Sequence, residues 1–112
     1  MKLINNFKSP NFDSRKKKRI KFIIIHYTAL KNKKEAVNHL IEKKNKVSSH
    51  FLICQNGLIY ILVKENKRAW HAGLSFWNNI TDINSHSIGI ELDYSPLDKN
   101  NRIMIAQGLK RI

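Results

Sequence analysis

Two apolar runs dominate the pattern of hydrophobic and polar positions along the chain, and each predicts a strand. Residues 22–25, FIII, are continuously apolar and rich in β-branched side chains, which favours a strand buried on both faces. Residues 87–92, SIGIEL, form a second strand pattern, in which Gly89 permits another segment to approach the backbone closely. The sequence therefore predicts two strands of a sheet, the first of them buried on both faces.

Helical periodicity occurs twice. Val37, Leu40 and Ile41 recur at the spacing of one helix face within residues 32–44, and lysines occupy other positions, so this segment predicts an amphipathic helix. A second helix is expected from Asn100 onward, where apolar residues recur at i, i+4 and i+7. The chain ends inside this stripe without a C-cap signal, so we expect the fold to be incomplete there.

Short strands and turns separate these segments. Residues 49–53 and 58–63 are strand-like, and a Gln-Asn-Gly sequence ending at Gly57 lies between them. Asn-Gly is a strong hairpin signal, because both residues tolerate positive φ angles. Residues 68–84 have the composition of an ordered surface loop. Since a hairpin supplies an antiparallel pair, the order of elements predicts an α/β domain with a mixed central β-sheet flanked by helices.

Length and composition limit the possible functions. With 112 residues, the chain is one small domain or part of one. No apolar run approaches the roughly 20 residues that span a bilayer. Residues 1–10 contain no apolar segment of the kind that directs secretion, so a cytoplasmic protein is expected. The single cysteine, Cys54, cannot form an internal disulfide and is expected to be a half-buried thiol in a reducing compartment.

The formal net charge of +13 suggests attraction to polyanions, but base composition offers a simpler explanation. Lysine, asparagine and isoleucine are abundant, and all three have AT-rich codons. No nucleic-acid recognition motif accompanies the charge, so we expect no nucleic-acid partner. The run at residues 15–19, RKKKR, is interpreted as a solvated turn. Residues 1–19 are then an irregular basic arm, and residues 20–112 form the domain.

His26 and Glu91 stand at the ends of the two buried strand patterns. Imidazole is the commonest neutral zinc ligand, although a strand-end histidine is more often structural. A carboxyl group beside an apolar wall tends to have a raised pKa, which suits a general base near neutral pH. Each residue is a weak signal when it is considered alone.

The loop at residues 68–73, RAWHAG, combines a guanidinium, an indole, an imidazole and a glycine. Trp70 and His71 offer flat faces and hydrogen-bond donors that suit sugar and peptide recognition. The alternative is a loop that Trp70 anchors to the core, and the residues do not decide between the two. Elsewhere, His39 is expected to be exposed on the lysine-rich helix, and His50 to be a core histidine with satisfied polar atoms.

Four motifs, in order along the chain, resemble the amidase-2 family. Residues 24–29, IIHYTA, resemble its first metal-ligand motif, and residues 47–53, VSSHFLI, resemble its central hairpin. Residues 68–73 resemble its substrate-groove motif, and residues 82–92, DINSHSIGIEL, resemble the strand that carries its catalytic glutamate. Residues 9–12, SPNF, resemble the arm of one bacterial branch, the AmpD-like and AmiD-like amidases.

The resemblance implies a fold, an activity and a role for each matched residue. The fold would be the one shared by the amidase-2 family and the peptidoglycan recognition proteins. The activity would be that of a bacterial zinc-dependent N-acetylmuramoyl-L-alanine amidase, which cuts the amide between N-acetylmuramic acid and L-alanine in peptidoglycan or anhydro-muropeptides. His26 would be the first zinc ligand, and Glu91 would be the general base. The residues of the substrate groove would be Arg68, Trp70, His71, Ala72 and Gly73.

The sequence departs from the family at its C-terminal end. The family's second histidine ligand and its aspartate ligand follow its last long helix, and nothing after Ile105 resembles that segment. The chain would therefore supply one of the roughly three protein ligands that a catalytic zinc site needs. We expect a C-terminally truncated domain with zinc weakly held or absent and with impaired or no activity. The alternative is a non-catalytic fragment that binds peptidoglycan or muropeptides.

Overall fold

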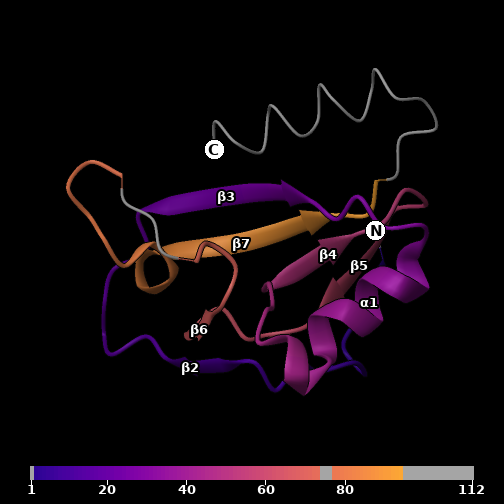
Figure 1. The fold of residues 1–112 in the computed structure, drawn as a ribbon, viewed down its shortest axis with the longest axis horizontal. Helices are drawn as coiled ribbons and strands as arrows, with labels where there is room; N and C mark the ends of the chain where they lie inside the picture. The colour runs from indigo at the N-terminus through magenta and orange to yellow at the C-terminus, as the bar shows by residue number, and fades with distance from the viewer. Residues whose placement is uncertain (1, 74–76, 95–112) are drawn as a thin grey trace.

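A five-stranded sheet forms the centre of the fold in a computed structural model, which describes residues 2–73 and 77–94 (Figure 1). The strands are β1 (Lys2–Ile4), β3 (Phe22–Tyr27), β4 (Phe51–Ile53), β5 (Leu58–Ile61) and β7 (Ser87–Leu92). Their order across the sheet is β1-β5-β4-β7-β3. Strands β4 and β5 are antiparallel, whereas the other neighbouring pairs in this sheet are parallel. The predicted mixed sheet is therefore confirmed.

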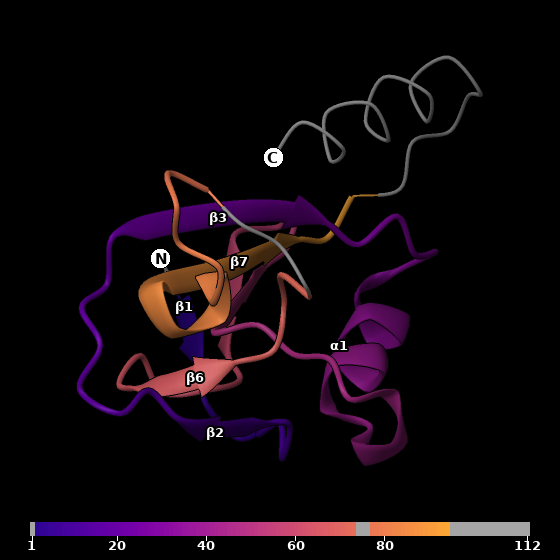
Figure 2. The ribbon, with the colours of Figure 1, turned by 60° about the vertical axis from the view of Figure 1, so that its left-hand side comes forward.

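The N-terminal arm is not irregular, because it contributes a strand to each of two sheets. Strand β1 runs parallel to β5 in the main sheet. Strand β2 (Phe12–Ser14) pairs antiparallel with β6 (Lys67–Ala69), and Figure 2 shows these two strands side by side. The expectation of an irregular arm over residues 1–19 is wrong for both strands, because their backbone groups find partners in segments that are distant in sequence.

One α-helix, α1 (Lys33–Ile41), packs on β4 and β5 (Figure 1). Its N-terminus is capped by Asn32, whose Oδ1 accepts a hydrogen bond from the Glu35 N–H at 3.0 Å. Two 3₁₀ segments also occur, η1 (Lys43–Asn45) and η2 (Ile83–His86). The predicted helix is confirmed, and its apolar stripe closes the main core. The buried members of that core are Ala36, Val37, Leu40, Leu52, Cys54, Tyr60 and Leu62.

The two faces of the sheet differ in how they are covered. Leu52 packs in the core beneath α1, and strand register places it beside Glu91, which in turn lies beside His26. These three side chains therefore share the face that α1 covers. Ile23 and Ile25 point to the opposite face, where they are 68% and 41% exposed. The expectation that residues 22–25 are buried on both faces is wrong for the described part of the chain.

Two sequence predictions concern the ends of the described region. The helix expected from Asn100 onward lies outside the described residues. Strand β7 has the bounds that the pattern at residues 87–92 predicted. Every helix in the described part is too short or too polar to traverse a lipid bilayer.

The hairpin between β4 and β5 is confirmed, but its turn differs from the expected one. The Gly57 N–H donates to the Cys54 carbonyl at 3.0 Å, and Gly57 has a φ of +89°. Asn56 instead contributes its side chain, whose Oδ1 accepts from the Leu58 N–H at 3.1 Å. The turn therefore needs a positive φ at Gly57, the residue that enters β5.

The Gly57→Ala substitution tests this turn. A Cβ at Gly57 would have no atom within 4 Å, so the cost comes from the positive φ alone. We expect the free energy of unfolding to fall by about 1 kcal/mol in urea titration. Gly57→Asn is the matched control and should lose less, because asparagine tolerates positive φ. Equal stability of the alanine variant and the wild type would contradict this account.

Candidate functional site

The site is built where β3 and β7 run side by side in parallel. Their register places His26 directly opposite Glu91, on the sheet face that α1 covers. The two strand-end residues that the sequence singled out are therefore neighbours. Parallel pairing brings them together because equivalent positions of adjacent parallel strands project from the same face.

Glu91 is a carboxyl group held in a dry environment. Burial raises its pKa from 4.5 to about 7. Its Oε2 atom is buried and has no hydrogen-bond partner among the described residues. A carboxyl group with this pKa exchanges its proton near neutral pH, which is the property expected of a general base or acid.

His71 lies flat against the bare backbone of Gly89. A Cβ at Gly89 would fall 2.5 Å from His71 Cδ2, so only glycine leaves room for the ring. The ring's Nδ1 is 3.1 Å from His26 Nε2, and its Nε2 is 2.9 Å from Ser87 Oγ. The close backbone approach predicted at Gly89 is therefore confirmed, and the approaching group is an imidazole.

The two imidazoles are held in their neutral forms. Burial, together with the neighbouring His26 and His50, lowers the pKa of His71 to about 3. Burial also lowers the pKa of His26. In the contact between the rings, one nitrogen carries the hydrogen and the other accepts it. Neutral imidazole is also the form that binds a metal ion.

The loop that carries His71 is attached through its backbone. The N–H groups of His71 and Ala72 both donate to Asn84 Oδ1, at 3.1 and 2.9 Å. One residue earlier, the Trp70 N–H donates to Ser48 Oγ at 2.9 Å, and the Ser48 N–H donates to the Trp70 carbonyl at 2.8 Å. Asn84 in η2 and Ser48 ahead of β4 therefore hold the loop from two sides.

The environment of Trp70 fits both of its predicted roles, an anchor to the core and a contact to a ligand. Its side chain is half-buried, as expected of an anchor to the core. Its Nε1 atom is buried and has no hydrogen-bond partner among the described residues, so it could donate to a bound molecule. At the end of the loop, Gly73 is exposed with a φ of +60°.

Arg68 is already engaged within the protein. Its Nη2 lies 2.9 Å from Asp82 Oδ1, and its Nη1 lies 3.3 Å from Asp13 Oδ1. Its Nε donates to Ser85 Oγ at 3.0 Å. A substrate contact at Arg68 would have to compete with these partners, so its role in a groove stays a prediction.

Sequence reasoning missed two polar residues behind the site. Arg15 was expected in a solvated turn, but its exposure is only 5%, and the expectation is wrong for this residue. Lys16 to Arg19 are exposed, as expected. Asn11 is buried, and its Nδ2 donates to the carbonyls of Glu42 and Val47 at 3.0 and 2.9 Å. Backbone carbonyls are the main partners of both residues, and no sequence pattern marks such acceptors.

His50 and His39 match their predicted environments. His50 is fully buried; its Nδ1 accepts from the Gly89 N–H at 3.0 Å, and its Nε2 lies 2.8 Å from the Lys67 carbonyl. These partners place the hydrogen on Nε2, so His50 is a satisfied core histidine. His39 is exposed on α1, also as predicted.

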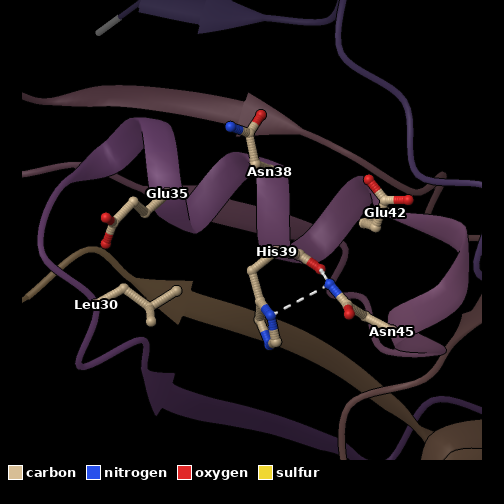
Figure 3. Close-up of a pocket in the computed structure, with 6 residues that line it drawn as sticks. All are labelled: Leu30, Glu35, Asn38, His39, Glu42 and Asn45. Carbon is tan, nitrogen blue, oxygen red and sulfur yellow. Dashed lines mark hydrogen bonds between the residues drawn. The ribbon is translucent and has the colours of Figure 1, made fainter.

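A separate pocket of about 340 Å³ lies on α1, away from His26 and Glu91 (Figure 3). The carboxylates of Glu35 and Glu42 lie at either end of it, apart from the His39 ring. Asn45 Nδ2 donates to the His39 carbonyl at 3.0 Å. The pocket therefore does not bring acidic and imidazole groups together for chemistry.

The donors of the described residues fit part of a zinc site. His26 offers a neutral imidazole beside the unpartnered Oε2 of Glu91. However, residues 2–73 and 77–94 contain no group of three or more His, Cys, Asp or Glu side chains placed to hold a metal ion. A catalytic zinc site needs about three protein ligands, so the described part does not form a complete one.

Residues 16–107 match the profile of a family described as N-acetylmuramoyl-L-alanine amidase. The chain is 44% identical over 82 residues to the N-acetylmuramoyl-L-alanine amidase AmiD of Escherichia coli, a match that covers 67% of this chain and 29% of the relative. It is 34% identical over 105 residues to the 1,6-anhydro-N-acetylmuramyl-L-alanine amidase AmpD of Haemophilus influenzae, covering 78% of this chain and 57% of the relative.

Solved structures show the same similarity. The complex of Escherichia coli AmiD with anhydro-N-acetylmuramic acid-L-Ala-D-γ-Glu-L-Lys matches with a TM-score of 0.59 and 43% identity. That match covers 68% of this chain and 31% of the solved chain. The chain thus spans 29% and 57% of the lengths of the AmiD and AmpD relatives named above.

The Gly89→Ala substitution tests the packing of the His71 ring. The added Cβ would overlap the ring at 2.5 Å, so the ring or the backbone beneath it must shift. We expect the free energy of unfolding to fall by about 1–3 kcal/mol in urea titration. In a His71→Ala background the same substitution should cost much less, because the overlapping ring is gone. Equal costs in both backgrounds would show that the ring does not set the requirement for glycine.

The Glu91→Gln substitution tests the environment of the carboxyl group. Between about pH 4.5 and 7 the folded chain keeps a proton on Glu91 that the unfolded chain releases, so the free energy of unfolding falls as pH rises through this range. Glutamine removes this penalty. The variant should exceed the wild type by on the order of 3 kcal/mol at pH 8 and by almost nothing near pH 4.

Urea titrations at both pH values measure the effect of Glu91→Gln. Glu42→Gln, at an exposed position on the C-terminal side of α1, is the control and should not show this pH-dependent difference. A difference between Glu91→Gln and wild type that is the same at pH 4 and pH 8 would mean that burial does not raise the pKa of Glu91.

Proposed function

Because this chain belongs to the N-acetylmuramoyl-L-alanine amidase family, we propose that it hydrolyses the amide between N-acetylmuramic acid and L-alanine in peptidoglycan or anhydro-muropeptides. The observation that carries the proposal is the buried carboxyl of Glu91, with a pKa of about 7, next to the neutral His26. This pair offers a proton acceptor at neutral pH beside a group that can bind a metal ion.

Glu91 acts as the general base in this proposal. Its carboxylate takes a proton from a water molecule, and the water oxygen attacks the carbonyl carbon of the lactyl amide. The carbon–nitrogen bond then breaks, and the proton on Glu91 passes to the amine of L-alanine. The products are the free lactyl carboxylate and the peptide amine, so one water is added across the bond. The pKa of about 7 allows Glu91 both to accept and to return the proton.

The groove residues hold the muropeptide in this proposal. Asn84 fixes the backbone of His71 and Ala72, which keeps the loop in one conformation for a ligand. The Trp70 Nε1–H would donate to a sugar or peptide oxygen, which would satisfy its unpaired donor. Gly73 lets the backbone turn at the exposed end of the loop, and Arg68 supports it through Asp13 and Asp82.

Zinc is the proposed cofactor, and His26 is its proposed ligand in the described part of the chain. When bound, zinc would lower the pKa of a water molecule and polarise the amide carbonyl. Because one imidazole does not hold zinc tightly, we expect the metal to be weakly held or absent in this chain. A cytoplasmic location in a bacterium belongs to the same proposal; the relatives named above come from bacteria.

A second function, muropeptide binding without hydrolysis, is favoured by the incomplete donor set of the described residues. The loop at Trp70 and His71 does not depend on a metal for its internal hydrogen bonds. The substrate present in the AmiD complex supports muropeptides as the ligand class for either function.

Incubation with anhydro-N-acetylmuramic acid-L-Ala-D-γ-Glu-L-Lys and excess zinc tests the proposed function. Mass spectrometry should detect slow release of the L-Ala-D-γ-Glu-L-Lys peptide by the wild type. Glu91→Ala should lower the rate by roughly 10²–10⁴-fold. Zinc content after dialysis should be far below one per chain, and His26→Ala should remove what remains, whereas Glu91→Ala should leave it unchanged.

The other outcomes separate the two functions. Binding of the muropeptide in calorimetry without peptide release would favour the binding module. If the muropeptide neither binds nor is cleaved, both proposals are overturned. Loss of zinc in Glu91→Ala would make Glu91 a ligand and remove it as the base.

A further inference from the structure

Arg15 is a buried cation that follows β2 directly. Arg15 is 5% exposed, and none of the salt bridges among the described residues involves it. Its charge is instead surrounded by five backbone carbonyl oxygens. Nη1 donates to the carbonyls of Asn84, Ser85 and Ser87 at 3.3, 3.0 and 3.0 Å, and Nη2 donates to those of Glu65 and Lys67 at 2.7 Å each.

Such an arrangement is costly, and one donor stays unpaired, because Nε is buried without a hydrogen-bond partner among the described residues. A buried charge loses its hydration, and removing its partners is strongly destabilising. Arginine suits the position because its planar fork presents donors in two directions from one side chain. A lysine carries the same charge on a single nitrogen with three donors, so it cannot reach both groups of carbonyls in the same way.

The carbonyls that Arg15 binds belong to the segments that hold the loop at residues 68–73, called the groove loop below. Lys67 begins β6, which leads directly into Trp70 and His71. Asn84 lies in η2, and its Oδ1 accepts from the N–H groups of His71 and Ala72.

Ser87 connects the carbonyl contacts of Arg15 to the contact between His71 and His26. Its carbonyl accepts from Arg15 Nη1, and its Oγ lies 2.9 Å from His71 Nε2. The other nitrogen of His71 contacts His26. One guanidinium therefore joins β6, η2 and the start of β7, the three segments whose relative placement sets the position of the His71 ring.

His50 lies against the guanidinium and shares an acceptor with it, the Lys67 carbonyl. Its Nε2 donates to the Lys67 carbonyl, so the 3.0 Å approach of Arg15 Nη2 to that nitrogen is a close contact and not a hydrogen bond. Burial is the largest cause that lowers the pKa of His50, and the charge of Arg15 lowers it further. His50 is thus a neutral neighbour of the cation.

We infer that Arg15 is the positioning residue of the groove loop: it locks β6, η2 and the start of β7 together, so that Asn84 and Ser87 hold His71 and Ala72 in place. The part of this inference that concerns substrate rests on the proposed function. The part that concerns the loop does not, because it depends only on contacts within the chain.

Hydrogen exchange of backbone amides tests the loop directly. Arg15→Lys keeps the charge but loses the fork, and we expect the His71 and Ala72 amides to exchange at least 10-fold faster. The amides of Cys54 and Glu42, which are bonded to Leu58 and Asn38 and not to the segments that Arg15 joins, should change less than two-fold. Arg19→Lys makes the same chemical change at an exposed position and should alter none of the four.

Asn84→Ala identifies the route of the effect. It removes the Oδ1 acceptor of His71 and Ala72 but keeps the backbone carbonyl that Arg15 binds. If Arg15 acts through Asn84, the double variant should expose the two amides no more than Asn84→Ala alone. Unchanged exchange in Arg15→Lys, an equal increase at all four amides, or additive effects in the double variant would overturn the inference.

A measurement on the wild type covers the case in which Arg15→Lys does not fold. If one opening motion breaks the Arg15 contacts and frees the loop together, the Arg15 Nη protons and the His71 and Ala72 amides should become accessible with the same opening equilibrium. Opening of the loop amides while the Nη protons stay protected would overturn the inference.

Muropeptide affinity tests the part of the inference that concerns substrate binding. The probe is anhydro-N-acetylmuramic acid-L-Ala-D-γ-Glu-L-Lys, measured by calorimetry at a temperature at which both proteins are folded. The Kd should rise at least 10-fold in Arg15→Lys and stay constant in Arg19→Lys. A wild type that binds no muropeptide would overturn the proposed function, whereas the exchange results would still decide the role of Arg15. If Arg15→Lys speeds exchange in the loop but leaves the Kd unchanged, the link between Arg15 and substrate binding is overturned.

Discussion

The contact between the His71 imidazole and the bare backbone of Gly89 is the constraint on which the site depends. The ring can lie on β7 only because residue 89 has no side chain, and a Cβ there would be 2.5 Å from the ring. Once it lies there, its two nitrogens meet Ser87 and His26, and its burial keeps it neutral. The groove loop, strand β7 and the histidine of β3 are thereby fixed relative to one another.

The site is built at the expense of stability, and Glu91 shows this most clearly. A carboxyl group whose pKa is raised to about 7 makes the folded state less stable at neutral pH than a neutral side chain would. The same burial gives Glu91 a basicity that an exposed glutamate lacks. The core beneath α1, with Leu52 beside Glu91 on the same face, supplies the apolar wall that causes both effects. Stability and reactivity are therefore opposite consequences of one environment.

The sequence predicted the elements that carry their own periodicity, and it missed contacts made by the backbone. The apolar runs located β3 and β7, and hence His26 and Glu91, because strand ends and parallel pairing follow from pattern alone. The hairpin followed from Asn-Gly, although only the structure shows that the positive φ lies at Gly57. Arg15 could not be recognised, because a basic run looks solvated and its partners are carbonyls of distant segments. The exposure of Ile23 was missed for a related reason, since an apolar run does not reveal which face is covered.

The N-terminal arm is a structural part of the site, and this follows from where its charges are placed. Strand β2 pairs with β6, the strand that leads into the groove loop, and its Asp13 is bonded to Arg68 across that pairing. The exposed Arg68–Asp13 pair contributes little by itself, since surface ion pairs are screened by solvent. Arg15, two residues later, is buried, and its carbonyl contacts are shielded from water. Antiparallel pairing sets the register of arm and loop, and the buried guanidinium then fixes the loop against η2 and β7. The loop thus takes its position from a segment that precedes β3 in the sequence.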